Sequence, residues 1–160
     1  MGTYRQAQIC LNGHTITSVA DQYPELREKF CSKCGAETVM DCPNCGVPIR
    51  GRYEVPGVIN VSRTYHPPLY CHNCGAPYPW TKSAMEAIQE LIWEDDDLFD
   101  DEKDRLCKSL PDIVAETPKT TLAVSRVKKS AMRGASILKD ALIQFAIDFG
   151  CELAKKQLGI

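Results

Sequence analysis

The chain has 160 residues, a formal net charge of −2 and 44% hydrophobic residues. This length accommodates one ordinary domain, or a small metal-stapled module joined to a helical one. The near-neutral charge argues against a protein built mainly to coat nucleic acid. The N-terminus lacks the apolar segment of a signal peptide, and no window approaches the roughly 18 apolar residues of a membrane span, so we expect a cytoplasmic protein.

Short strands are expected in the first half of the chain. Alternation over residues 1–9 and β-branched residues over 15–19 predict one brief strand each, and the polar segment 21–29 predicts a loop or a single helical turn. Residues 47–61 predict a hairpin, with residues 49–55 and 58–61 as its arms and Pro56-Gly57 as its turn.

Eight metal-competent side chains lie in four short clusters within this half. The clusters are CLNGH (residues 10–14), CSKCG (31–35), CPNCG (42–46) and CHNCG (71–75). Each places two ligands on one tight turn, and four such pairs supply two tetrahedral zinc sites. Cysteines paired this tightly are not typical of a disulfide framework, and three C-x-x-C pairs without a βαβ pattern are not typical of a redox motif.

Two pairings of the clusters compete. In the sequential pairing, one zinc binds Cys10, His14, Cys31 and Cys34, and the other binds Cys42, Cys45, Cys71 and Cys74. In the alternative, the two middle clusters form one site and the two outer clusters meet across the whole module. We favour the sequential pairing because it avoids closing one very long loop.

The composition changes near residue 80, where alanines, leucines and alternating charges begin. We place a domain boundary there, between a β-rich module over residues 1–80 and a helical region of about four helices over residues 81–160. Ser83 with Glu86 fits a capping box at the start of the first helix. Pro111 predicts a break before a short helix over residues 112–116, and Thr117-Pro118 predicts the start of a helix that ends near Gly134.

Residues 136–158 are expected to form the longest helix, which is apolar on two sides. A second copy or another protein is expected to cover one side, with complete burial within the chain as the alternative. Charges in this region are divided, because residues 94–104 carry eight acids and one lysine whereas residues 105–160 carry ten basic and five acidic groups. Pairing of the two segments within the molecule is the simpler interpretation, and a phosphate-binding basic face is the alternative.

Residues 10–75 resemble a double zinc ribbon, in which two rubredoxin-type pairs of knuckles follow one another. The first pair resembles the form C-x-x-G-H … F-C-x-x-C-G-A. More widely, CLNGH, FCSKCG, PPLYCHNCGAPYPWT and ETPKTTLAVSRVKK together are similar to a family of small uncharacterised bacterial proteins with a zinc-ribbon front and a helical tail. The resemblance implies this α+β architecture and carries no activity.

We therefore expect a scaffold or adaptor with two structural zinc ions and no catalytic role. Each predicted site is filled by four protein ligands, and no motif of a catalytic zinc site is present. A protein partner or a second copy is expected to bind through the ribbons and the C-terminal helices, with nucleic-acid binding as the alternative. The candidate binding surface comprises aromatic and basic residues, namely Arg50, Arg52, Tyr53, Arg63, Tyr65, Tyr70, Tyr78 and Trp80.

Overall fold

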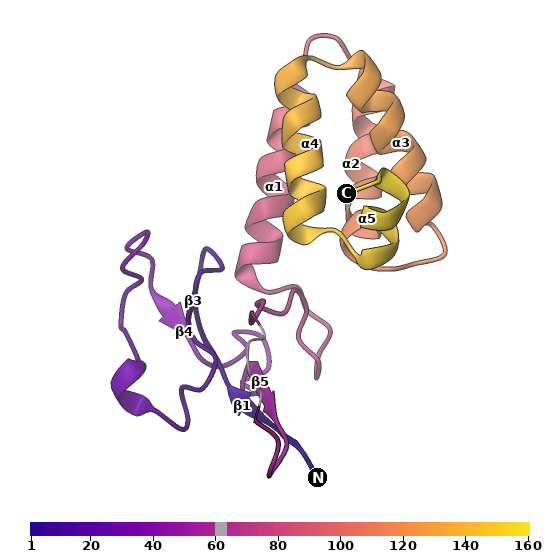
Figure 1. Cartoon of the computed structure of the whole chain (residues 1–160). Coiled ribbons are helices and arrows are strands. Elements are labelled where there is room, and N and C mark those ends of the chain that lie inside the picture. The colour runs from indigo at the N-terminus through magenta and orange to yellow at the C-terminus, as the bar shows by residue number, and fades with distance from the viewer. Residues whose placement is uncertain (60–63) are drawn as a thin grey trace. The chain divides into compact units, whose positions relative to one another are not determined.

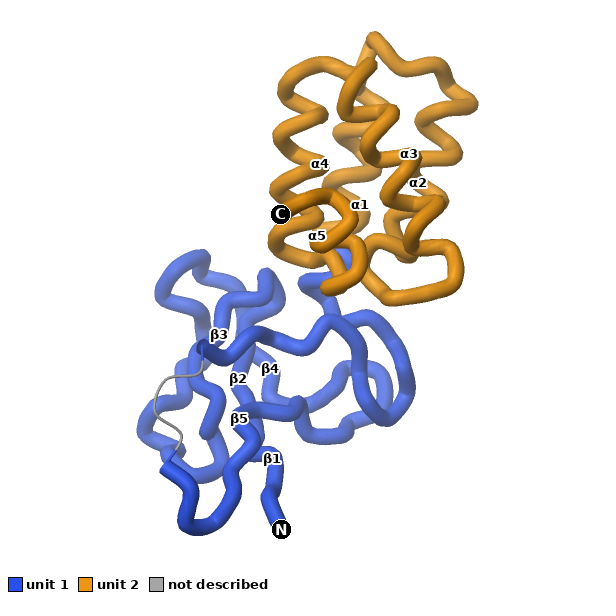
Figure 2. The backbone as a smooth tube through the Cα atoms, turned by 45° about the vertical axis from the view of Figure 1, so that its right-hand side comes forward, with its two compact units in different colours: residues 1–83 blue, residues 84–160 orange. Residues whose placement is uncertain are grey.

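The computed structural model describes residues 1–59 and 64–160, which divide into two compact units, residues 1–83 and 84–160 (Figure 2). Short strands precede the helices along the chain (Figure 1). The predicted α+β class is therefore confirmed. Helix α1 (Pro79–Glu94) begins in the first unit and continues into the second.

Two small antiparallel sheets form in the first unit. In one, β2 (Gln8–Cys10) lies between β3 (Thr15–Thr17) and β4 (Thr38–Val39). In the other, β1 (Thr3–Gln6) pairs with β5 (Arg50–Glu54), and a 3-10 turn, η1 (Pro24–Leu26), lies in the predicted polar loop. Because β2 ends at Cys10, the central strand of one sheet delivers the first predicted ligand.

The hairpin predicted over residues 47–61 is present in its first arm, which is β5, and in its turn. The turn at Pro56 and Gly57 is present, with the Val58 N–H donating to Val55 O at 3.1 Å. However, β5 pairs with the N-terminal strand β1, because residues 49 and 51 are buried against the N-terminal backbone. Residues 60 and 61 of the predicted second arm lie outside the described residues.

Gly51 lies where β5 meets the backbone of two other segments. A Cβ on residue 51 would lie 2.1 Å from Ser18 O and 3.0 Å from Ala7 N. Both neighbours belong to the backbone and are themselves fixed, since Ser18 O accepts the Arg52 N–H and the Ala7 N–H donates to Ile49 O, each at 2.9 Å. The structure therefore requires glycine at this position.

We expect Gly51→Ala to lower the free energy of unfolding of the first unit by about 3 kcal/mol, the upper range for overpacking. Denaturant unfolding at saturating zinc measures this change. Gly57→Ala is the control, because residue 57 has a φ of +80° and a Cβ there would meet only open space within 4 Å. Its expected cost is only the left-handed strain of about 1 kcal/mol, and equal costs at the two positions would contradict the close approach at residue 51.

Four helices follow α1 in the second unit. They are α2 (Asp100–Val114), α3 (Thr120–Arg133), α4 (Ser136–Phe149) and α5 (Glu152–Leu158). Helix α3 packs against α2, α4 and α5. Its buried face consists mainly of Ala123, Val124 and Val127, and the facing helices contribute Leu106, Leu110, Leu138 and Leu142 among others. Apolar residues at helical spacing thus bury a common core.

Helix α1 begins earlier than predicted, and α2 runs through the predicted break. Because α1 begins at Pro79, Ser83 lies inside the helix and does not form the predicted capping box. Proline at a first helical position was the start signal in the sequence. Pro111 lies inside α2, where burial of Leu110 and Ile113 outweighs the cost of about 3 kcal/mol for an internal proline.

Helix α3 begins at Thr120, after the predicted Thr117-Pro118 start. The N-cap of α3 is Lys119 and not the predicted Thr117. Thr117 forms the turn before the helix, since its Oγ1 accepts the Lys119 N–H at 3.0 Å and its own N–H donates to Thr120 Oγ1 at 2.9 Å. The turn signal was correct, and the regular helix follows it by one short turn.

The helix predicted over residues 136–158 is divided in two at Gly150. The backbone is extended at Gly150 and Cys151, with ψ angles of 145° and 160°. The Cys151 N–H donates to Ile113 O in α2 at 2.8 Å, so a tertiary hydrogen bond replaces a helical one. The break turns α5 onto α3, and the chain has five α-helices within its described residues.

The acidic segment 94–104 contains one buried carboxylate, that of Asp95, which is 6% exposed. Asp95 Oδ1 accepts the N–H groups of Asp97 at 2.9 Å and Leu98 at 3.0 Å, and Oδ2 accepts that of Ala135 at 2.9 Å. This side chain therefore joins the α1–α2 connection to the α3–α4 connection.

We expect Asp95→Ala to lower the free energy of unfolding of the second unit by about 3 kcal/mol, because three backbone donors lose a charged acceptor. Thermal or denaturant unfolding followed by the helical circular dichroism signal measures the loss. Asp96→Ala, one residue along on the exposed surface, is the matched control with an expected change within about 0.5 kcal/mol. Similar losses of unfolding free energy in the two variants would contradict a stabilising role for the buried hydrogen bonds of Asp95.

Other charges of this segment pair within the second unit. Arg133 on α3 bonds Glu102, and within α2 Arg105 pairs with Asp101 and Lys108 with Asp104, at 3.0 and 2.6 Å. These pairs follow the simpler of the two predicted interpretations, in which acidic and basic segments neutralise one another. Across residues 1–59 and 64–160, the helices are too short or too polar to cross a membrane.

Candidate metal centres

The three C-x-x-C clusters share one backbone turn. In each, the glycine after the second cysteine donates its N–H to the carbonyl oxygen of the first cysteine, at 2.7–2.9 Å. These glycines, Gly35, Gly46 and Gly75, have φ angles of +72°, +74° and +71°, a conformation that glycine adopts without a steric penalty. The turn places both sulfur atoms on the same side of the chain, as metal knuckles require.

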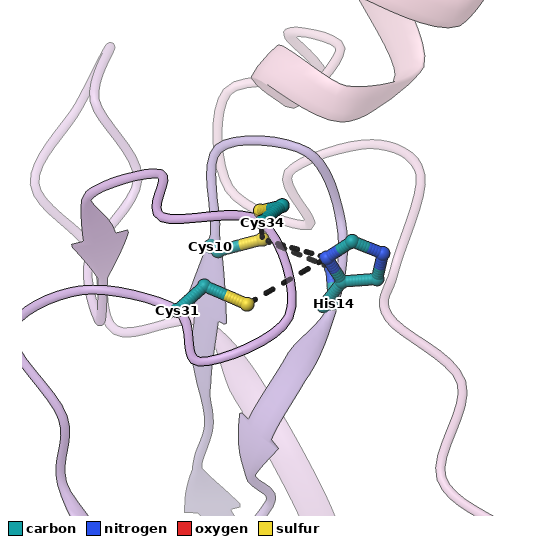
Figure 3. Close-up of side chains that lie close together, drawn as sticks. All are labelled: Cys10, His14, Cys31 and Cys34. Atoms are coloured by element: carbon teal, nitrogen blue, oxygen red, sulfur yellow. Dashed lines mark hydrogen bonds between the residues drawn. The ribbon is translucent and has the colours of Figure 1, made fainter.

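The first candidate site unites Cys10, His14, Cys31 and Cys34 (Figure 3). His14 Nδ1 lies 3.5 Å from Cys10 Sγ and 3.6 Å from Cys31 Sγ, and the two sulfur atoms of Cys10 and Cys34 are 3.7 Å apart. Cys10 Sγ also accepts the His14 N–H at 3.2 Å, which closes the CLNGH turn.

The second candidate site unites Cys42, Cys45, Cys71 and Cys74. The Sγ atoms of Cys42 and Cys74 are 3.8 Å apart, and those of Cys45 and Cys71 are 3.7 Å apart. The structure thus brings the ligands together in the sequential pairing. In each group, the four ligand atoms lie within 4.8 Å of one another.

Both donor sets fit a zinc ion. Tetrahedral bonds of about 2.3 Å to sulfur and about 2.0–2.1 Å to nitrogen separate two sulfurs by about 3.8 Å, and a sulfur from a nitrogen by about 3.6 Å. The distances between ligand atoms, 3.7–3.8 Å and 3.5–3.6 Å, agree with these separations. Three thiolates with one imidazole, or four thiolates, are also ligand sets that zinc prefers.

Burial raises the pKa of the cysteine thiols, and hydrogen bonds from backbone and side-chain amides lower it. Burial raises the pKa of Cys42 to about 11 and also raises the pKa of Cys10. The Ala36 N–H, with the Asn12 amide, lowers the pKa of Cys34 to about 6, and the Cys74 N–H lowers that of Cys71 to about 6. A cation that binds Cys42 therefore displaces a proton, whereas Cys34 and Cys71 offer thiolates at neutral pH.

Two residues of the predicted binding surface are buried, and their placement on an exposed surface is wrong. Tyr78 is 1% exposed and Trp80 is 3% exposed. Their rings stack with centroids 4.7 Å apart, and Trp80 Nε1 donates to Pro68 O at 2.9 Å. Trp80 also packs against the first knuckle, since a Cβ on Gly13 would lie 2.9 Å from Trp80 Cβ. A unit with two small sheets needs these rings for its core.

Three other residues of the predicted surface, Arg50, Arg52 and Tyr53, lie on β5. Arg50, Arg52 and Tyr53 are exposed, whereas Tyr65 and Tyr70 are half-buried. The Tyr65 hydroxyl donates to Arg50 O at 2.7 Å. Arg63 lies outside the described residues.

Three asparagines at the sites were missed by the sequence reasoning. The side-chain amides of Asn12, Asn44 and Asn73 each donate to a cysteine sulfur. The signal in the sequence was an asparagine at the third position of three of the four clusters, in CLNGH, CPNCG and CHNCG.

The chain is a small α+β protein, in which small sheets are followed by helices. Its first unit contains two candidate metal centres, each a cysteine-rich group of four ligands. The chain belongs to the family DUF2321, described as "Uncharacterized protein conserved in bacteria", whose model matches residues 3–158. The predicted resemblance to a family of uncharacterised bacterial proteins is thereby confirmed. No curated protein and no solved structure matches the chain.

Proposed function

We propose that the protein is a scaffold stiffened by two structural zinc ions, and that residues 1–80 form a double zinc ribbon. The observation that carries this proposal is the geometry of the two groups, in each of which four ligand atoms lie within 4.8 Å of one another. Four protein ligands fill a tetrahedron and leave no position for water or substrate. The proposal therefore assigns the metals no catalytic step and the chain no enzymatic activity.

The scaffold binds a protein through its helical unit, either a second copy or a different chain. Exposed apolar side chains on α4 support this part of the proposal, since Ile137 is 71% exposed and Ile147 is 43% exposed. Met132, near the end of α3, is 83% exposed. Contiguous exposed apolar patches mark interaction surfaces, and these three side chains are our candidates for such a surface in the helical unit.

The test combines metal analysis with the mass and partners of the full chain. Purified protein is expected to contain two zinc ions per chain, and a value near one would contradict the two-site assignment. For the interaction, Ile137→Asp and Ile147→Asp are expected to abolish self-association seen by light scattering, or to abolish retention of a protein that co-purifies from the native bacterium. Lys139→Asp, at an exposed polar position of the same helix, is the matched control. Equal behaviour of the three variants would contradict binding through α4.

Nucleic-acid binding is the second candidate function, and a cluster of two tyrosines and one arginine on β1 and β5 favours it. The Arg50 guanidinium lies over the Tyr4 ring at 4.6 Å, and the rings of Tyr4 and Tyr53 have centroids 4.8 Å apart. All three side chains are exposed. Aromatic rings beside arginine are the surfaces on which bases of single strands stack.

Binding of labelled single-stranded DNA and RNA in low salt tests this candidate. Tyr4→Ala and Arg50→Ala are expected to weaken binding about tenfold each, in line with about 1–3 kcal/mol per stacked base. Lys33→Ala, an exposed cation outside this cluster, is the control. Absence of binding by the unsubstituted protein in low salt would eliminate this function.

A further inference from the structure

Three of the eight predicted ligands are exposed cysteines, and each accepts a hydrogen bond from an asparagine. Asn12 Nδ2 donates to Cys34 Sγ at 3.4 Å, and Asn44 Nδ2 donates to Cys74 Sγ at 3.4 Å. Asn73 Nδ2 donates to Cys45 Sγ at 3.6 Å. Among the described residues, no side-chain amide reaches the four buried ligand cysteines, which are Cys10, Cys31, Cys42 and Cys71.

Each asparagine reaches across its site to the opposite cluster. In the second site the arrangement is reciprocal, because Asn44 of the 42–45 turn bonds Cys74 while Asn73 of the 71–74 turn bonds Cys45. In the first site only one half of this arrangement is present, through Asn12. The equivalent of Asn73 in the first site is Lys33, and the ligand opposite it is His14, which offers an imidazole nitrogen and not a sulfur.

The number of amide donors also follows the charge of each site. A zinc ion with four thiolates carries a net charge of −2, and with three thiolates and a neutral histidine it carries −1. The four-cysteine site has two asparagine donors, and the three-cysteine site has one. A hydrogen bond to a metal-bound sulfur withdraws negative charge from it and fixes its orientation.

We propose that Asn12, Asn44 and Asn73 are positioning residues that shield the exposed thiolates from electrophiles and so keep the zinc ions bound. In each C-x-x-C pair the second cysteine is the exposed residue, and its Sγ is the atom that the amide engages. The inference rests on the proposed occupancy of both sites by zinc. It adds that the exposed cysteines are protected ligands and not reactive thiols.

Alkylation of the zinc-loaded full chain with iodoacetamide tests the proposal. The sulfur attacks the methylene carbon of the reagent, so that a C–S bond forms, the C–I bond breaks and iodide leaves. The thioether product is a neutral, weaker ligand, so zinc is released and can be followed with a colorimetric chelator. Peptide mass spectrometry gives the alkylation rate of each cysteine separately.

The expected result is specific to the partner of each asparagine. Asn44→Ala should speed alkylation of Cys74 about tenfold, and Asn73→Ala should do the same at Cys45, as for other residues that support metal ligands. Asn44→Asp keeps the shape of the side chain but replaces the donor with a negative charge, so it should also speed the reaction at Cys74. If Asn44→Asp behaves as the unsubstituted protein, or if both cysteines of a pair react faster together, the asparagine acts through packing and the proposal is overturned.

Substitutions at position 33 provide a control and can also introduce the second asparagine donor that the first site lacks. Lys33→Ala should leave the alkylation rates in the first site unchanged. His14→Cys creates a fourth thiolate without an amide donor, and alkylation at position 14 should then be faster than at Cys34. Adding Lys33→Asn should slow the alkylation at position 14. No slowing in the double variant would count against the proposal.

Zinc content measured before alkylation distinguishes failure of the proposed two-zinc scaffold from failure of the shielding by asparagines. Fewer than two zinc ions in the unsubstituted protein would overturn the proposed function and this inference together. Two zinc ions with unchanged alkylation in the asparagine variants would overturn the shielding alone.

Discussion

Removal of metal by a chelator is expected to unfold the first unit and to leave helices α2 to α5 folded. Over residues 1–59 and 64–83 the first unit has only short strands, the longest of which is β5 with five residues, so its apolar core is small. A structural zinc ion contributes about 10–16 kcal/mol at neutral pH, more than such a core can replace. The second unit has its own apolar core and includes none of the candidate ligands.

Hydrogen exchange followed by mass spectrometry measures this result along the chain. Amides of β2 and of the three knuckle turns should lose their protection when the chelator is added, and those of α2 and α3 should keep it. Addition of zinc should restore protection, which distinguishes metal removal from damage by the reagent. Protection that persists in the first unit without metal would contradict a scaffold held by zinc.

The clusters and their turns could be predicted because they depend on local chemistry. A C-x-x-C-G segment contains both ligands and the glycine that closes the turn, and Gly35, Gly46 and Gly75 all adopt the positive φ that this requires. The pairing of the clusters followed from loop length, which is also visible in the sequence.

Features that depend on distant contacts could not be predicted in this way. The strand β5 pairs with β1 at the N-terminus, and residue 51 approaches the backbone of Ser18, and no local sequence pattern indicates either contact. Likewise, Tyr78 and Trp80 look like surface aromatics beside a proline, but the knuckle at Gly13 packs directly on Trp80.

The helix boundaries failed for the same physical reason. Pro111 stays within α2 because its neighbours are buried, and α4 ends at Gly150 because the Cys151 N–H has a partner at Ile113 O in another helix. Local propensity is a weak preference, and tertiary burial or a tertiary hydrogen bond outweighs it.

Cys71→Ser is expected to lower the zinc content from two ions to one per chain. A serine hydroxyl is not ionised at neutral pH and is a poor zinc ligand, so the site of Cys42, Cys45 and Cys74 keeps three thiolates and loses most of its affinity. The other group shares no ligand with it and should keep its ion. Quantification of zinc after dialysis against a weak chelator measures the stoichiometry.

Cys107→Ser is the matched control, because Cys107 lies on α2, half-buried and outside both groups. It should keep two zinc ions, whereas His14→Ala should lose the ion of the first site and keep that of the second. Cys71→Ser and His14→Ala are each expected to lose a single ion, with hydrogen-exchange protection lost only around the affected knuckles. This result would show that the two sites bind zinc independently within one unit. A loss of both ions in either single variant would instead mean that the first unit folds around the two metals together, which would contradict separate sites.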